Sequence, residues 1–153
     1  MTDMTLDDID VKILKILQAD GRTALSEIAR RLDMGSATIH ERVNSLEAEG
    51  YIRDYRAVLD PELLGLDDVA FIRIHTEAGH FSEVAERLAE ESAIQEIHEL
   101  TGEADLLLKV RVGDRSDLTD LLSRIGTYEG VISTATDVAL RSVKEEQRLN
   151  LPE

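Results

Sequence analysis

The chain has 153 residues and a formal net charge of −15, with 32 Asp and Glu against 17 Lys and Arg. It contains no cysteine, which excludes a disulfide framework, a thiolate metal site and a Cys nucleophile. No run approaches the roughly 18 consecutive apolar residues of a membrane span, and the acidic residues 1–5 do not resemble a secretory signal. We therefore expect a cytoplasmic protein with no membrane partner.

The acidic residues lie mainly in the second part of the chain. Residues 1–60 hold 12 acidic and 8 basic side chains, whereas residues 61–153 hold 20 and 9. Net negative charge argues against a nucleic-acid partner, but this distribution leaves the arginines of the first part free to gather on one face. Only four of the 17 basic residues are Lys, and acid-rich, lysine-poor surfaces resemble those of halophile proteins. This indicates a halophilic source, although many mesophilic proteins are also acidic.

Two helices are predicted in the first 35 residues. Apolar residues recur at helical spacing over residues 6–17, and this helix ends near Gly21. Thr23 can cap a second helix of about two turns, which ends at residues 33–35, Asp-Met-Gly.

A third helix follows, with Ile39, Val43 and Leu46 on its buried side, and ends at Gly50. Two short helices, a turn that contains Gly and a longer third helix predict a helix-turn-helix. Loose alternation over residues 51–59 predicts a small wing or strand behind it.

The exposed side of the third helix is the face that a recognition helix offers to the major groove of double-stranded DNA. Its candidate DNA-binding residues are Ser36, Ala37, Thr38, His40, Glu41, Arg42, Asn44 and Ser45. Hydroxyl, imidazole and amide groups can bond base edges or phosphates, and Arg42 is better aimed at the backbone. Glu41 is discordant because it repels phosphates unless a cytosine amino group donates to it. A merely solvated helix face is the alternative.

After residue 68 the apolar period changes to two. The expected elements are, in order, a strand over residues 69–76, a helix over 81–91, strands over 94–100 and 106–112, a helix capped by Asp114, and a strand over 131–140. In the first of these helices the inward candidates are Val84, Leu88 and Phe81. Two βαβ halves predict a ferredoxin-like βαββαβ domain, and hence an α+β protein. Its helices cover one sheet face, so the other face, with Phe71 and Leu107, predicts a dimer or larger oligomer.

We therefore expect four segments along the chain. These are a winged helix-turn-helix over residues 1–60, a linker over 61–68, the βαββαβ domain over 69–142 and a charged tail over 143–153 that frays.

The order of many short motifs is specific. They include Leu6-Asp7-Asp8-Ile9-Asp10, Asp20-Gly21-Arg22, Ser36-Ala37-Thr38-Ile39, Gly50-Tyr51-Ile52, and Thr101-Gly102-Glu103-Ala104-Asp105 followed by Leu106 to Val110. Over about the whole chain this pattern resembles the Lrp/AsnC (feast/famine) transcription regulators, here with the composition of a halophilic archaeon. One departure is Gly35, where the family usually has Ser at the opening of the recognition helix, so the capping residue stays open.

The resemblance implies a sequence-specific DNA-binding regulator, a homodimer joined through the sheets of its second (RAM) domains and assembling into tetramers or octamers. An amino acid or related metabolite would bind between dimers, near the Gly-x-x-Asp turn. On this chain the effector-binding residues would be Gly102, Glu103, Asp105, Thr134 and Thr136. A carboxylate can pair with an ammonium group, and hydroxyls can hold a carboxylate. An ordinary turn, and the plain β propensity of Thr, remain the alternatives.

Nothing in the sequence predicts a metal, a cofactor or an enzyme. His40, His75, His80 and His98 lack ligand spacing, and no catalytic arrangement stands out. Two other functions stay open: an architectural DNA-binding protein without an effector, and an enzyme like the sirohaem decarboxylases, which resemble this family across both domains. Such an enzyme needs basic groups for its many-carboxylate substrate, and Glu103 here argues against it.

Overall fold

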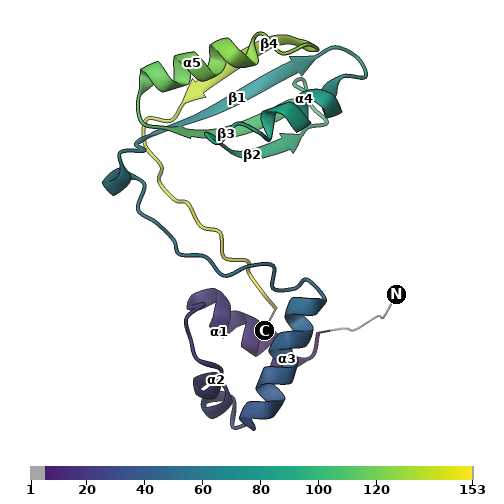
Figure 1. The fold of residues 1–153 in the computed structure, drawn as a ribbon, viewed down its shortest axis with the longest axis vertical. Coiled ribbons are helices and arrows are strands. Elements are labelled where there is room, and N and C mark those ends of the chain that lie inside the picture. Colours follow the sequence, from purple (N-terminus) through teal and green to yellow (C-terminus); the bar gives the residue numbers. More distant parts are fainter. Residues whose placement is uncertain (1–5, 153) are drawn as a thin grey trace. The chain divides into compact units, whose positions relative to one another are not determined.

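The computed structural model describes residues 6–152 and divides into two compact units. Unit 1 comprises Met1–Val58 together with Glu146–Glu153, and unit 2 comprises Leu59–Glu145 (Figure 1). The polypeptide therefore leaves unit 1 after Val58 and returns to it at Glu146. Among the described residues no helix is long and apolar enough to cross a membrane.

Unit 1 contains three helices, α1 (Asp8–Ala19), α2 (Leu25–Leu32) and α3 (Ser36–Ala48). Their apolar stripes face one another because residues three and four apart share one side of a helix. The buried core is formed by Ile13, Leu17, Ile28, Ala29, Ile39, Val43 and Leu46. The three predicted helices are thus confirmed, with the predicted apolar residues of α3 inside.

The helix ends differ from expectation in two places. Thr23 does not cap α2, because its hydroxyl donates to the carbonyl of Asp20 at 2.8 Å and Ala24 is the N-cap residue. The N-cap of α3 is Gly35, which offers no side-chain hydrogen bond to the first turn. This answers the question that the sequence left open, since Ser36 is already the first residue of α3.

Residues 51–59, predicted to form a small wing or strand, do not form a strand. Residues 53–60 form neither helix nor strand, and Val58 and Leu59 are 97% and 67% exposed. A strand needs a neighbour to bond its main chain, and the described residues of unit 1 supply none at this place.

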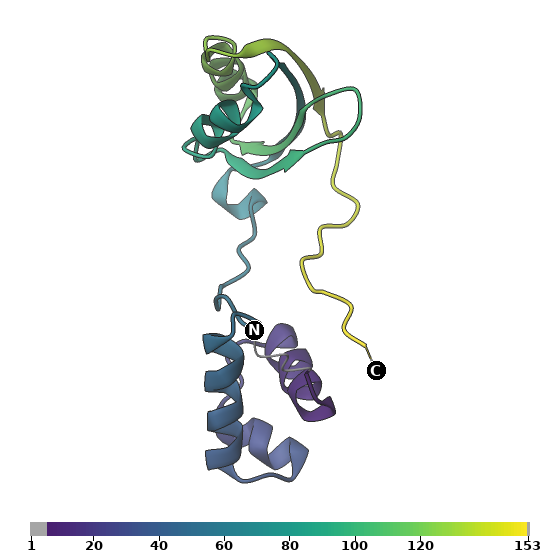
Figure 2. The same cartoon turned by 90° about the vertical axis from the view of Figure 1, so that its right-hand side faces the viewer.

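Unit 2 begins with a short 3₁₀ helix, η1 (Glu62–Leu64), and continues as a four-stranded sheet with two helices. In chain order the elements are β1 (Asp68–Thr76), α4 (Phe81–Leu88), β2 (Ile94–Glu99), β3 (Leu106–Val112), α5 (Arg115–Ile125) and β4 (Val131–Val138). The strand order is β2-β3-β1-β4, with every pair antiparallel. Both helices cover the same face of the sheet (Figure 2). The predicted α+β class and the ferredoxin-like arrangement are confirmed.

Strand alternation builds the core of unit 2. Ala70, Ile72 and Ile74 are fully buried on the helix-covered face, whereas Phe71 between them is 38% exposed on the other. Their partners in the core are Val84, Leu88, Leu106, Leu108, Val110, Val112, Leu118, Leu121 and Ile125. Asp114 caps α5 as expected, accepting from the N–H groups of Ser116 and Asp117 at 2.7 and 3.0 Å. Of the three inward candidates on this helix, Val84 and Leu88 are buried, whereas Phe81 is 41% exposed at the first turn of α4.

Gly130 fixes the approach of the chain to β4. It has φ +88°, and a Cβ placed there would lie 2.7 Å from Cβ of His80. Its carbonyl accepts from the N–H of Glu77 at 2.8 Å. Both the left-handed backbone and the missing side chain are therefore required where the ends of β1 and β4 meet.

Candidate nucleic-acid interface and effector site

The outward face of α3 is polar and open. All but one of the candidate DNA-binding residues are exposed, namely Ser36, Ala37, Thr38, His40, Glu41, Asn44 and Ser45. Within residues 6–152 the side chains of Thr38, His40 and Asn44 make no hydrogen bond or ion pair. Their polar groups are therefore free to bond a base edge or a phosphate, because no contact in the chain has to be broken first.

Arg42 is the exception, because it is engaged inside unit 1. Its Nη1 donates to Oδ2 of Asp7 at 2.7 Å and to Oδ1 of Asp10 at 2.8 Å. Asp7 and Asp10 also form a capping box at the start of α1. The pKa of Asp7 lies below its usual value because the N–H of Asp10 donates to it, with Arg42 as the next cause. Arg42 thus joins α3 to the N-terminus of α1.

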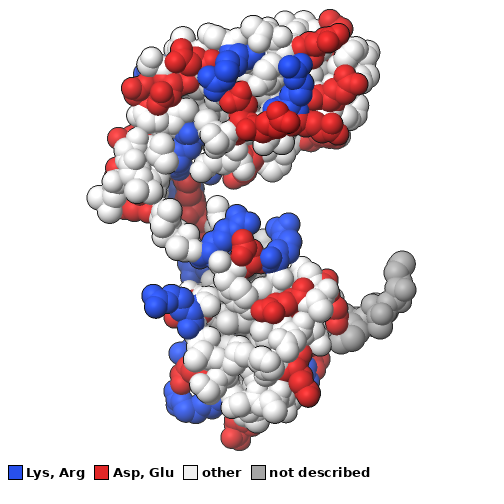
Figure 3. All heavy atoms as spheres, viewed as in Figure 1, with Lys and Arg blue, Asp and Glu red and all other residues white. Residues whose placement is uncertain are grey.

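The basic side chains of unit 1 do not form one continuous patch on the face seen in Figure 3, where blue and red groups are interspersed. On α2, Glu27 pairs with Arg30 at 2.7 Å and with Arg31 at 2.8 Å. These hydrogen bonds, Arg30 first, lower the pKa of Glu27 to about 2. The side chains of both arginines remain at least half exposed, at 74% and 50%, so they can still contact a phosphate.

Glu47, near the end of α3, has a partner outside the helix. The hydroxyl of Tyr55 donates to Oε1 of Glu47 at 2.9 Å. Burial, and then this hydrogen bond, raise the pKa of Tyr55 to about 12. The irregular segment behind α3 is therefore attached to the recognition helix through a tyrosine rather than through a strand.

In unit 2 the candidate effector residues centre on Asp105, which directly precedes β3. Its Oδ2 accepts from the main-chain N–H of Thr76 at 2.7 Å and from the Thr76 hydroxyl at 3.1 Å. These contacts, the main-chain donor first, hold the pKa of Asp105 below its usual value. One carboxylate oxygen is thus occupied by the end of β1. No hydrogen bond to the other oxygen is made within residues 6–152.

The remaining candidates are brought together only in part. Gly102 and Glu103 are exposed in the loop before Asp105, and open space surrounds the position of a Cβ on Gly102. Thr134 of β4 pairs with Ile74, whose carbonyl accepts from the N–H of Asp105 at 3.0 Å. Asp105 and Thr134 therefore flank the same end of β1, two strand spacings or roughly 10 Å apart. Thr136 pairs with Ile72, farther from that end.

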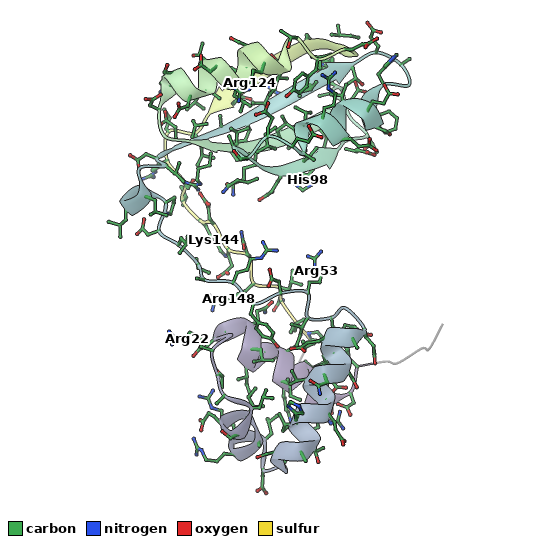
Figure 4. All side chains as sticks on the ribbon, viewed as in Figure 1. Arg22, Arg53, His98, Arg124, Lys144 and Arg148 are labelled. Atoms are coloured by element: carbon green, nitrogen blue, oxygen red, sulfur yellow. The ribbon has the colours of Figure 1, made fainter. Side chains whose placement is uncertain are left out.

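The uncovered face of the sheet combines apolar and charged groups. Phe71 and Leu107 lie among ion pairs, of which Arg73 with Asp137 measures 2.9 Å. Glu145 reaches Nη2 of Arg111 at 2.7 Å and Nζ of Lys109 at 3.5 Å. Arg111 and Lys109 are consequently only 9% and 17% exposed. His98 on the neighbouring strand, labelled in Figure 4, contacts Glu96 at 3.1 Å.

Sequence reasoning missed two contacts that bear on these sites. Asp10 is buried on the same helical side as Ile13 and Leu17, and a carboxylate at core spacing signals that a buried cation partner is needed. The contact between Thr76 and Asp105 joins residues 29 apart, and only the antiparallel pairing of β1 with β3 brings them together.

Comparison with known proteins decides the family. Residues 6–53 match the winged helix-turn-helix DNA-binding domain, and residues 69–149 match the Lrp/AsnC ligand binding domain. The chain belongs to the Lrp/AsnC family.

Relatives of this Lrp/AsnC protein match it over nearly its full length. The HTH-type transcriptional regulator FL11 of Pyrococcus horikoshii is 42% identical over 144 residues, which cover 94% of this chain and 95% of FL11. Among solved structures, the transcriptional regulator NMB0573 from Neisseria meningitidis, in complex with L-Met, has a TM-score of 0.89 at 30% identity, covering 95% of this chain and 97% of that chain.

AsnC of E. coli also has a TM-score of 0.89, at 27% identity and covering 94% and 98% of the two chains. These relatives are transcriptional regulators, which confirms a DNA-binding regulator rather than an enzyme.

Proposed function

We propose that this Lrp/AsnC protein binds specific operator sequences through α3, and that an amino acid or a related metabolite bound to unit 2 changes its affinity for them. The observation that carries the first part is that Thr38, His40 and Asn44 are exposed on one face of α3 and have no side-chain partner within residues 6–152. We expect it to act in the cytoplasm, where its DNA is found.

The second part rests on the loop before β3. Glu103 is exposed, and Asp105 keeps one oxygen that Thr76 does not occupy. Carboxylates at this place favour a ligand with an ammonium group, and the hydroxyl of Thr134 is a donor for its carboxylate. In a single chain Gly102 and Glu103 are exposed to solvent. We therefore propose that a second dimer completes it, in a tetramer or octamer.

The dimer itself would form through the uncovered sheet face. Phe71 is 38% exposed there, and a single chain leaves Phe71 and Leu107 without a covering layer. A two-fold axis through this face would pair the apolar centre with its own copy and leave the ion pairs of Arg73 and Lys109 around it.

Fluorescence anisotropy on DNA selected from a random pool tests the proposal, with each of the twenty amino acids added in turn. We expect at least one of them to change the Kd for selected DNA, and the same compound to raise the unfolding temperature. A ligand at 100 times its Kd stabilises the folded state by about 2.7 kcal/mol. Binding that spreads along any DNA and ignores every amino acid would favour an architectural protein instead.

Asp105→Asn then separates the two roles of that residue. The amide oxygen can still accept from Thr76, whereas the negative charge that would hold an ammonium group is gone. We expect the response to the active amino acid to disappear while operator binding without effector is unchanged. Ser92→Ala is the control, an exchange elsewhere in unit 2 that should leave the response intact.

A further inference from the structure

The C-terminal segment docks on α1 through a single side chain. The sequence predicts a tail that frays, but the side-chain amide of Gln18 donates to the carbonyl of Leu149 at 2.8 Å and accepts from its N–H at 2.8 Å. These two bonds join residues 131 apart in the sequence. A primary amide presents a donor and an acceptor side by side, so Gln18 binds the tail as a neighbouring strand would.

The contact is made to the main chain of the tail. The side chain of Leu149 is 71% exposed and so contributes little to it. Glu146 accepts from the main-chain N–H of Arg148 at 2.9 Å and from its guanidinium at 2.6 Å, which shapes the tail just before Leu149. Arg148 is labelled in Figure 4. Local order in the tail lowers the entropy lost when Leu149 meets Gln18.

The side of α1 that carries Gln18 is suited to a covering segment. Val11, Leu14 and Gln18 are spaced at i, i+3 and i+7, so they form one stripe, and each is half-buried. Leu151, two residues after the bonded Leu149, is half-buried as well, whereas residues 141–150 are all exposed. These features favour docking of residues 146–152 over a tail that is free in solvent.

We propose that residues 146–152 are a strap that attaches the DNA-binding unit to the end of the chain. Unit 1 is then connected to unit 2 by two segments, the one that follows Val58 and the one that precedes Glu146. Two connections allow fewer orientations than one. In a dimer the strap therefore narrows the range of distances between two DNA half-sites that can be bound together. This last step rests on the proposed dimeric function.

Hydrogen exchange in the full-length protein, followed by mass spectrometry, tests the docking directly. The Leu149 amide should exchange roughly tenfold more slowly than a free amide, as two hydrogen bonds permit, and Gln18→Leu should return it to the free rate. Leu149→Pro removes the N–H and should release the strap likewise, whereas Leu149→Ala keeps the main-chain bonds and should retain protection. Free exchange at Leu149 in the wild type would overturn the proposal.

The consequence for DNA is tested with selected half-sites whose spacing is varied one base pair at a time. We expect the wild type and Leu149→Ala to bind one spacing at least three-fold better than its neighbours, and Gln18→Leu to lose this preference while keeping its affinity for a single half-site. Equal preference in all three proteins, with protection at Leu149 confirmed, would show that the strap exists but does not restrain the DNA-binding unit, and this arm of the proposal would be wrong. Failure of every variant to bind DNA would instead count against the proposed function.

Discussion

Arg42 of α3 donates to Asp10 of α1 at 2.8 Å, and this bond holds the recognition helix against the first helix of unit 1. The side chain of Asp10 is only 12% exposed and that of Arg42 30%. A buried carboxylate that loses its cation keeps its desolvation cost without compensation. We therefore expect Arg42 to affect DNA binding by positioning α3, in addition to any contact with a phosphate.

Replacing Arg42 tests this role. We expect Arg42→Ala to lower the free energy of unfolding by about 1–3 kcal/mol, measured by urea unfolding, because Asp10 is left without a charged partner. The same change should weaken binding to all DNA sequences alike. Arg30→Ala is the control, since Arg30 is an exposed partner of Glu27 and its loss should leave stability nearly unchanged. Equal stability of the two variants would contradict the positioning role.

Gly130 provides a second test of packing. Gly130→Ala should destabilise the protein by about 2–5 kcal/mol, because it adds a Cβ against His80 to the cost of the left-handed backbone. Gly65→Ala is the matched control variant. Gly65 has φ +69° with open space around a Cβ, so only the backbone cost of about 1–2 kcal/mol remains. Gly130→Ala should therefore have a clearly lower unfolding temperature than Gly65→Ala. The reverse order would refute the contact with His80.

Glu145 makes stability depend on pH in a definite direction. A hydrogen bond from Ser142, followed by those from Arg111, lowers the pKa of Glu145 from 4.5 to about 2. A lowered pKa means that the ionised group stabilises the fold fully above about pH 4.5, and that this contribution is lost as the pH falls through about 2. Unfolding of the wild type in this window should take up about one proton more than unfolding of Glu145→Gln.

Acid unfolding curves measure that difference. Glu27 and Glu146, whose pKa values are also lowered to about 2, likewise destabilise the fold when they are protonated. Glu145→Gln should therefore still lose part of its stability at low pH. The exposed residue Glu90 supplies the control, because Glu90→Gln should follow the wild type. Superimposed curves for Glu145→Gln and the wild type would exclude the contribution of Glu145.

The charge of unit 1 leads us to propose an unusual response to salt. For a protein that neutralises Z phosphates, the logarithm of the association constant falls with the logarithm of the salt concentration, with a slope of about −0.9Z. Among the eight basic residues of the first 60, four already have acidic partners, namely Arg30, Arg31, Arg42 and Arg56. We expect a shallow or reversed slope for operator affinity in potassium chloride, as suits a halophilic source. Glu41→Gln with Glu47→Gln should steepen it toward ordinary negative values, whereas a steep slope in the wild type would contradict the proposal.

Much of the fold follows from periodicity. The inward positions of α3, β1 and β3 could be predicted because helices and strands repeat every 3.6 and 2 residues, and burial follows those repeats. The cap at Asp114 was predictable for a local reason, since an Asp side chain bonds the next turn of its own helix. Thr23 does not cap α2 because its hydroxyl donates to the carbonyl of Asp20 instead. The spacing of residues does not show which of two competing local hydrogen bonds forms.

The sites were predictable only as far as they are local. The exposed face of α3 is a property of one helix, so its residues could be assigned from the sequence. The pairs Arg42 with Asp10, Thr76 with Asp105 and Gln18 with Leu149 join distant segments, and each depends on how the chain folds back on itself. The strand predicted after α3 failed for the same reason, since a strand is defined by its partner.

Site selection from a random DNA pool tests the central claim that α3 distinguishes sequences. We expect a defined consensus for the wild type, and a changed base preference at one position for Asn44→Ala, because a lost base-edge contact costs about 1–3 kcal/mol selectively. Ser26→Ala, an exposed change on α2, should keep the wild-type consensus. An Asn44→Ala consensus identical to that of the wild type would contradict the assignment of sequence recognition to this residue on the exposed face of α3.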